Sequence, residues 1–236
     1  MSLIDNQQPK IIIKWLFNYS QWPITEPELQ PYIRLLNTIN EREKITNLVY
    51  LSDKLASLTG RLMLYKLISM ILLELEKKKR VEGDDKTLLE LWKKIEIEYS
   101  KDGKPKVSEK LIKEYPSLIN LRFNIAHHGD YSILIAGYRI HLGVDVMQIK
   151  LVQNEISEMN FISDFEGEFS KREWNEIIKH HSKSKHYTSL NRFMEYWCLK
   201  EALLKGIGIG LQLPLNEIDF NLNEKPAKQN LIKLKG

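Results

Sequence analysis

Cysteine is nearly absent from this chain of 236 residues, in which Cys198 stands alone. An intrachain disulfide is therefore excluded, and a reducing compartment fits the sequence best. Histidine and cysteine do not recur at the spacings of a zinc site. The adjacent histidines His127 and His128 point in different directions from an extended or turn backbone, which argues against joint zinc ligation.

Long hydrophobic runs and targeting signals are also missing. The most apolar run, LISMILLEL from Leu67, is too short to cross a bilayer and leads directly into EKKKR. The opening residues, MSLIDNQQPK, lack the basic start and the long apolar stretch of a signal peptide. We therefore expect a cytoplasmic protein that makes no contact with a membrane.

Neither sign of charge is in large excess. Lysine and arginine total 35, aspartate and glutamate total 31, and the formal net charge is +4. This balance is compatible with an anionic small ligand, an acidic protein partner or nucleic acid. The chain has no recognised nucleic-acid-binding motif and no basic stripe interleaved with aromatic residues, so we expect no nucleic-acid partner.

The first part of the chain has the pattern of one strand followed by helices. Residues 11–19 are β-branched and aromatic, which predicts a strand. Residues 26–38 predict a helix that Pro31 breaks, and residues 42–79 predict one long helical region. Gly60 lies inside the apolar pattern of that region, where a glycine indicates close packing. The expected core positions of the long region are Leu55, Leu58, Leu62, Tyr65, Ile68 and Leu72.

The later part of the chain alternates between strand and helix patterns. Residues 118–150 contain several β-type runs broken by glycine, and residues 211–222 predict a further strand. Helices are expected over 170–179 and 191–205. This order predicts an α+β protein of two lobes, with residues 1–141 in the first and 142–236 in the second.

The segment YWCLKEALLKGIG, from Tyr196, carries three charged residues among residues suited to a core. At about 100° per residue, Glu201 and Lys205 lie on the flank of the apolar face, and Lys200 lies at its border. One interpretation is an exposed ion pair between Glu201 and Lys205, with the Lys200 ammonium reaching water along the helix. The other is that these charges face a ligand.

The segment GVDVM places an acid at the end of an apolar strand. Strand alternation puts Asp145 and Met147 on the face opposite Val144 and Val146. Asp145 is either an exposed strand residue or a ligand. If Asp145 and Glu201 converge, their oxygens suit Mg²⁺, which takes one or two carboxylates and leaves positions for phosphates.

Four segments in this order resemble the 4'-phosphopantetheinyl transferases of the two-lobed, surfactin-synthetase-activating type. They are FNIAHHGDY, LGVDVM, FSKREW and YWCLKEALLKGIGIGL. Arg61 in TGRLMLYKLI, Lys104 in DGKP and the early KWLFNYSQWP are similar to the eukaryotic aminoadipate-semialdehyde dehydrogenase-activating branch. The resemblance implies two similar α+β lobes related by pseudo-two-fold symmetry, with coenzyme A and Mg²⁺ in the cleft between them.

The resemblance also implies a metal site. Carried over by motif position, Asp145 and Glu201 are metal ligands, and Glu173 in FSKREW is a further, indirect ligand. Bacterial members usually place a second acid where this sequence has Met147, so a water is expected there. Glu201 or a metal-held water would accept the proton of the attacking serine, and the sequence leaves both open.

Five basic residues are implied to contact coenzyme A. Lys205 would contact the pyrophosphate and His127 a coenzyme A phosphate, the 3'-phosphate by its position in the motif. Lys200 would lie near the ligand phosphates, and Lys44 and Lys104 near the nucleotide end. A single histidine beside a glycine has a structural role as often as it binds a phosphate, so both roles stay open for His127. Ala126 stands where the family has a serine, so one local hydrogen bond of the family pattern is lost.

The resemblance implies an Mg²⁺-dependent enzyme that transfers 4'-phosphopantetheine from coenzyme A to a serine of an apo carrier protein or carrier domain. Adenosine 3',5'-bisphosphate is the expected by-product, and a monomer is expected because one chain supplies both lobes. The alternative is a coenzyme A-binding relative with little or no turnover. The chain ends soon after LNEIDFNL, where relatives usually continue, so either the second lobe is unusually small or the chain is a shortened one. The acceptor is left open among a lysine-biosynthesis reductase, a fatty-acid synthase carrier and a folate-linked dehydrogenase.

Overall fold

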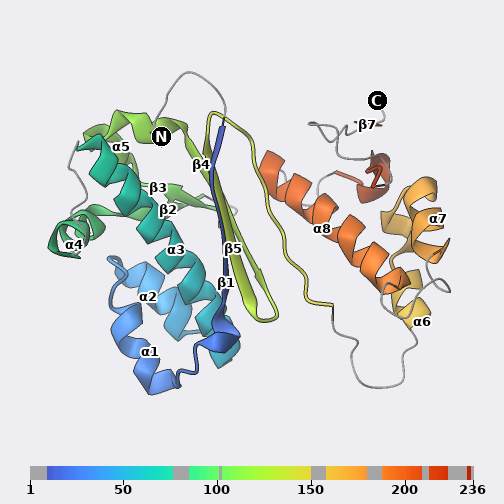
Figure 1. Ribbon diagram of the computed structural model, residues 1–236, viewed down its shortest axis with the longest axis horizontal. Helices are drawn as coiled ribbons and strands as arrows, with labels where there is room; N and C mark the ends of the chain where they lie inside the picture. Colours follow the sequence, from blue (N-terminus) through green and yellow to red (C-terminus); the bar gives the residue numbers. More distant parts are fainter. Residues whose placement is uncertain are drawn as a thin grey trace. The chain divides into compact units, whose positions relative to one another are not determined.

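The structure, a computed structural model, describes residues 10–76, 85–100, 103–149, 158–179, 188–208, 213–222 and 233–234. The chain divides into two compact units, Met1–His141 and Leu142–Gly236. Helices and strands are mixed in the described residues, as Figure 1 shows, so the fold is α+β.

The first unit is built on a three-stranded antiparallel sheet in the order β1-β5-β4. The strands are β1 (Lys10–Asn18), β4 (Leu121–His128) and β5 (Tyr131–Tyr138). Strand β1 confirms the strand predicted over 11–19. Strands β4 and β5 form a hairpin whose turn includes Gly129 at a φ of 60°, a left-handed conformation that glycine adopts without strain.

Helix α3 (Leu51–Leu75) packs against β4 and β5 and supplies much of the core. Five of the six predicted core positions of this region are buried, and Leu62 is half-buried. The prediction of close packing at Gly60 is confirmed, because a Cβ atom there would lie 2.9 Å from Cγ2 of Ile125.

Two predictions about the helices of this unit are wrong. The region predicted as one helix over 42–79 is two, α2 (Ile39–Thr46) and α3, because the chain turns at Asn47, which caps α2. Pro31 does not break α1 (Glu26–Ile33). A proline there removes one backbone hydrogen bond, and the helix continues for only two residues beyond it, anchored by its buried Leu29 and Ile33.

The remaining elements of this unit are short and include a β-hairpin. Helix α4 spans Asp85–Lys94 and precedes the hairpin in the chain. Strands β2 (Ile97–Tyr99) and β3 (Pro105–Val107) pair across a turn in which Gly103 has a φ of 77°. Helix α5 (Glu109–Glu114) and the 3-10 helix η2 (Pro116–Asn120) lead into β4, and the 3-10 helix η1 (Tyr19–Gln21) follows β1.

Helix α3 is also long and apolar enough to cross a membrane, judged by length and composition alone. At 25 residues, α3 is much longer than the nine-residue apolar run LISMILLEL that it contains. However, 67% of its most apolar window is buried inside the structure. Packing in the core of the first unit therefore accounts for the apolar character of α3, because a helix buried in a protein core can be as long and as apolar as one that spans a membrane.

The second unit is mainly helical where it is described. Helices α7 (Lys171–Lys179) and α8 (Ser189–Ile207) confirm the predictions for 170–179 and 191–205. Phe165, Phe169, Phe193 and Trp197 form an aromatic cluster with ring centroids 5.3–6.3 Å apart. The other elements are α6 (Glu158–Ser163), η3 (Glu166–Glu168), η5 (Leu215–Glu217), β6 (Ile218–Asp219) and β7 (Lys233–Leu234).

The segment around Asp145 is not part of a sheet. Residues 140–149 belong to no assigned strand, and β6, which falls in the strand predicted over 211–222, is only two residues long. The prediction of a strand through GVDVM is therefore wrong. Its β-branched valines favour an extended backbone, and here that backbone packs along α8 instead of pairing with a neighbouring strand.

Candidate functional site

Gly143 allows the chain to approach α8 closely. A Cβ atom at this position would lie 1.8 Å from the carbonyl oxygen of Ala202 and 2.5 Å from the backbone nitrogen of Gly206. Any side chain here would collide with the helix backbone. The glycine of the GVD motif therefore brings the next residues, including Asp145, directly onto α8.

Asp145 and Lys205 form an ion pair. The Lys205 Nζ atom lies 2.5 Å from Oδ1 of Asp145, whose side chain is only 8% exposed. The second carboxylate oxygen, Oδ2, is buried and finds no hydrogen-bond partner among the described residues, although the Cys198 thiol lies beside the carboxylate. A buried carboxylate oxygen without a partner is costly, so this atom is suited to receive a cation or a donor that the protein itself does not supply.

Glu201 lies on the same side of α8 as the groups around Asp145. Cys198 and Lys205 both neighbour Asp145, and at about 100° per residue Glu201 lies within about 60° of each around the helix axis. Glu201 is half-buried and makes no hydrogen bond or ion pair with the described residues. We use the name carboxylate face of α8 for Cys198, Glu201 and Lys205 of this helix together with Asp145, which packs against it.

A pocket of about 480 Å³ opens beside the carboxylate face. Met147, Met194 and Leu199 supply apolar walls, and Asp145 and Cys198 lie among its lining residues. In the described parts of the chain, no group of three or more histidine, cysteine, aspartate or glutamate side chains is arranged to hold a metal. Any cation bound here would therefore have few protein ligands and several waters, as Mg²⁺ does.

The thiol of Cys198 should be unusually unreactive. Burial and the nearby Asp145 carboxylate raise its pKa to about 12 from an ordinary value of 9.0. The thiolate is the nucleophile, so near pH 8 we expect alkylation by iodoacetamide to be at least about tenfold slower than that of a free thiol. Because Cys198 is the sole cysteine, mass spectrometry over time reports this one site. Asp145→Asn should accelerate the reaction, and alkylation of the parent at the free-thiol rate would contradict the buried geometry.

Lys200 and Glu173 do not occupy the positions expected of a phosphate contact and a metal ligand. Both side chains are fully buried, and Lys200 Nζ lies 2.8 Å from Oε2 of Glu173. The same ammonium donates 2.7 Å hydrogen bonds to the carbonyls of Leu215 and Ile218. These three partners use all its protons, so the two residues belong to the core rather than to a ligand site.

The neighbours of Glu173 complete this network. Its carboxylate accepts hydrogen bonds from the backbone N–H groups of Ser170 and Phe220, at 3.0 and 2.9 Å. Burial lowers the pKa of Lys200, and the Glu173 carboxylate opposes that effect. The pair ties α8 to α7 and to the η5–β6 segment, and it leaves the carboxylate face on another side of α8.

A second group of predicted residues surrounds a cavity of about 230 Å³ in the first unit. We call it the basic cavity. Arg61, Tyr99, Gly103 and His127 are among its lining residues. Lys104 lies in the turn of the β2–β3 hairpin, between the lining residues Gly103 and Pro105.

The basic side chains of this cavity gather around Tyr99. The Lys44 ammonium lies 3.4 Å from the centre of the Tyr99 ring, and the Arg61 guanidinium carbon lies 6.0 Å from it. Burial raises the pKa of the Tyr99 phenol, and the Arg61 charge opposes this. Of the basic residues predicted for this end of the ligand, His127 lines the cavity, and so does the acidic Glu41. Lys44 lies over the ring of the lining residue Tyr99, and Lys104 is a chain neighbour of two lining residues.

Arg61 is the main residue that the sequence did not assign to a site. It donates a 3.0 Å hydrogen bond to the carbonyl of Ser57, but its Nε atom is buried and has no hydrogen-bond partner among the described residues. An unpartnered guanidinium N–H at the wall of a cavity is suited to bind an anionic oxygen. The available signal was an arginine within the apolar pattern of α3.

An α+β protein with a basic cavity and a carboxylate–lysine face has the side chains that a phosphate-ester ligand and a divalent cation require. Comparison with known proteins gives the family: the chain belongs to the 4'-phosphopantetheinyl transferases. Residues 20–139 match the N-terminal domain described as "4'-phosphopantetheinyl transferase, N-terminal", and residues 141–235 match the "4'-phosphopantetheinyl transferase superfamily".

Similar proteins include animal and protist members of this family. The chain is 29% identical to "L-aminoadipate-semialdehyde dehydrogenase-phosphopantetheinyl transferase" of Mus musculus over 89% of its own length and 58% of the mouse protein. The Homo sapiens protein of the same name is also 29% identical, over 89% and 60% of the two chains. A "Phosphopantetheinyl transferase" of Thraustochytrium sp. is 28% identical over 78% and 57%. The chain thus spans about 60% of the length of these relatives.

Proposed function

We propose that this protein transfers the 4'-phosphopantetheine arm of coenzyme A to a serine of an apo carrier protein, with Mg²⁺, releasing adenosine 3',5'-bisphosphate. The observation that carries the proposal is the state of Asp145. One of its oxygens is paired with Lys205, and the other is buried with no hydrogen-bond partner in the described parts of the chain, beside the helix face that carries Glu201. Membership of the family supports the same reaction.

The donor set fits Mg²⁺. Asp145 Oδ2 and the Glu201 carboxylate are hard oxygen donors, and neither forms a hydrogen bond or ion pair within the described residues. Mg²⁺ is held in many phosphate-binding sites by one or two carboxylates, with waters and substrate phosphates completing the shell. When bound, the ion would neutralise charge on the coenzyme A diphosphate.

The reaction needs no nucleophile from this chain. The serine oxygen of the carrier bonds to the phosphorus that bears the pantetheine arm, and the bond from that phosphorus to the leaving bisphosphate oxygen breaks. Lys205 provides a positive charge beside the site for the diphosphate oxygens. Glu201, half-buried and without a described partner, accepts the serine proton directly or through a water.

The other parts of the ligand match cavities within each unit. In the first unit, Arg61 and His127 line the basic cavity and would bind a phosphate of the nucleotide end. In the second unit, the apolar pocket beside Asp145 would receive the uncharged pantetheine arm. Lys44 and Lys104 add positive charge around the nucleotide.

The acceptor class follows from the names of the relatives. Those of mouse and human are named for aminoadipate-semialdehyde dehydrogenase. We propose a carrier domain of this kind, in a lysine-pathway reductase or dehydrogenase, as the first acceptor to test, with acyl and peptidyl carriers alongside it.

Intact-mass spectrometry of apo carriers tests the function. The full chain, coenzyme A and Mg²⁺ should add one phosphopantetheine mass to at least one carrier in a panel of aminoadipate, acyl and peptidyl types. Chelation with EDTA should stop the transfer, and excess Mg²⁺ should restore it. Binding of coenzyme A without transfer to any carrier would overturn the proposal and indicate a non-catalytic relative. Full activity in EDTA would overturn the metal assignment.

A further inference from the structure

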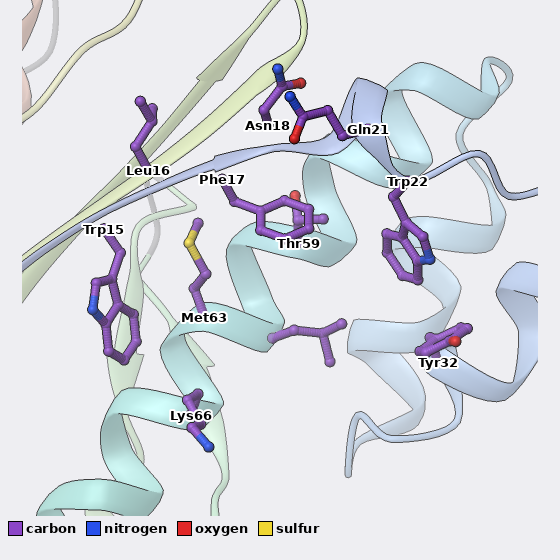
Figure 2. Close-up of a pocket in the computed structure, with 11 residues that line it drawn as sticks. Trp15, Leu16, Phe17, Asn18, Gln21, Trp22, Tyr32, Thr59, Met63 and Lys66 are labelled. Atoms are coloured by element: carbon purple, nitrogen blue, oxygen red, sulfur yellow. The ribbon is translucent and has the colours of Figure 1, made fainter.

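The first unit contains a larger pocket that the proposed reaction does not use. It has a volume of about 690 Å³ and lies between β1, η1, α1 and α3 (Figure 2). Its lining residues include Thr59, Leu62, Met63 and Lys66 of α3, none of which lines the basic cavity. We call it the aromatic pocket.

Aromatic rings form the walls of this pocket. Trp15 and Phe17 lie two residues apart on β1, so both side chains point to the same face of the strand, toward α3. Met63 approaches them from that helix, as Figure 2 shows. Phe17 and Tyr32 each contact Trp22 edge-on, at centroid distances of 6.4 and 4.8 Å. These contacts fix the three rings against one another, and the pocket is open in the structure without a ligand.

Phe17 and Tyr32 nevertheless remain 40% and 39% exposed. Exposed aromatic area of this kind is unfavourable in water and is removed from it when an apolar molecule binds.

The charged and polar side chains at the two ends of the pocket indicate the class of ligand. Lys66 is exposed and makes no ion pair or hydrogen bond with the described residues. Among the described residues that line the pocket, it is the single charged one. In Figure 2 the carboxamides of Asn18 and Gln21 lie at the other end of the pocket. A complementary ligand therefore has an apolar body and one anionic end group.

The size of the pocket favours a small molecule over a protein partner. Its volume lies within the range of about 300–1,000 Å³ that is usual for small-ligand sites. Eleven residues line it, about half of the 20–30 that one side of a standard protein interface uses.

We propose that the aromatic pocket is a second binding site, for an amphiphilic monocarboxylate whose carboxylate pairs with Lys66 and whose apolar body lies between the indole, phenyl and phenol rings. This site is independent of the proposed transfer reaction. The aromatic pocket and the basic cavity therefore favour different ligands. One cation beside a large apolar surface favours a hydrocarbon with a single negative charge over a polyphosphate.

Quenching of tryptophan fluorescence by ω-bromododecanoate tests this proposal directly. Two of the five tryptophans, Trp15 and Trp22, line the pocket, and bromine quenches an indole that it contacts. Titration of the full chain below the micelle concentration should give saturable quenching at a stoichiometry of one. Coenzyme A with Mg²⁺ should not displace the probe, and displacement would place the probe at the transfer site and overturn the proposal.

Charge-reversal variants give the matched comparison. Lys66→Glu should weaken bromododecanoate binding about tenfold at low salt, because it places a like charge beside the carboxylate. Lys113→Glu makes the same charge change at an exposed lysine of α5 and should leave the affinity unchanged. Uncharged ω-bromododecanol should bind Lys66→Glu and the parent equally. Quenching that does not saturate, or equal binding of the carboxylate to Lys66→Glu and the parent, would overturn the proposal.

Discussion

Replacement of Asp145 by asparagine or of Glu201 by glutamine is expected to lower the rate of phosphopantetheine transfer about a hundredfold or more. Each change keeps the side-chain volume and removes one negative charge from the donors proposed for Mg²⁺. The loss follows because charge on the reacting diphosphate would no longer be neutralised by a firmly held cation. The measurement is the rate of carrier mass gain at saturating coenzyme A, repeated over a range of Mg²⁺ concentrations.

Matched variants separate this effect from a general loss of charge. Asp164→Asn and Glu217→Gln remove exposed carboxylates from the same unit and should transfer at the parent rate. Higher Mg²⁺ concentrations should rescue Asp145→Asn or Glu201→Gln in part if the lost group holds the metal. Transfer by both site variants at the rate of the two controls would show that these carboxylates do not form the metal site.

Loss of the Lys200–Glu173 pair is expected to destabilise the second unit severely. Lys200→Met leaves the buried Glu173 carboxylate without its cation, and Glu173→Gln leaves the buried ammonium without its anion. Breaking one partner of a buried, hydrogen-bonded ion pair costs about 3–5 kcal/mol, because the remaining charge is neither paired nor hydrated. Urea unfolding followed by tryptophan fluorescence would report the change in unfolding free energy.

The double variant Lys200→Met/Glu173→Gln should recover part of that loss, since it leaves no charge buried alone. The pair Glu176–Lys179 on α7 provides a control in the same unit. It is an i,i+3 pair with the lysine side chain 59% exposed, so Lys179→Met should cost less than about 1 kcal/mol. A loss for Lys200→Met as small as that for Lys179→Met would mean that the pair does not hold α8 in place.

The fold could be predicted from the sequence wherever local periodicity and burial agree. The apolar spacing in α3 identified core positions such as Leu58 and Ile68, and Gly60 marked the contact with Ile125. Predictions that depend on distant partners did less well. The valines around Asp145 favour an extended chain, but only a neighbouring strand would make that segment part of a sheet, and none pairs with it in the described residues.

The candidate site shows the same division between local and distant information. Helical periodicity places Lys200 at the border of an apolar face and Lys205 on its flank, so the two lysines look alike in the sequence. In the structure Lys200 is fully buried against Glu173 and two carbonyls, whereas Lys205 contacts Asp145. Residues 15–60 positions away decide the role of each lysine, and helical spacing carries no information about them.

The sequence by itself determined the family and the helix that carries Glu201 and Lys205. These depend on motif residues at fixed spacing and on the conformations that single residue types allow. Only the tertiary structure decided that Glu173 and Lys200 belong to the core, that Arg61 joins the basic cavity, and that Trp15, Trp22 and Lys66 surround a separate pocket. The physical reason is that burial and pairing depend on which distant segments pack together, and packing is a property of the whole folded chain.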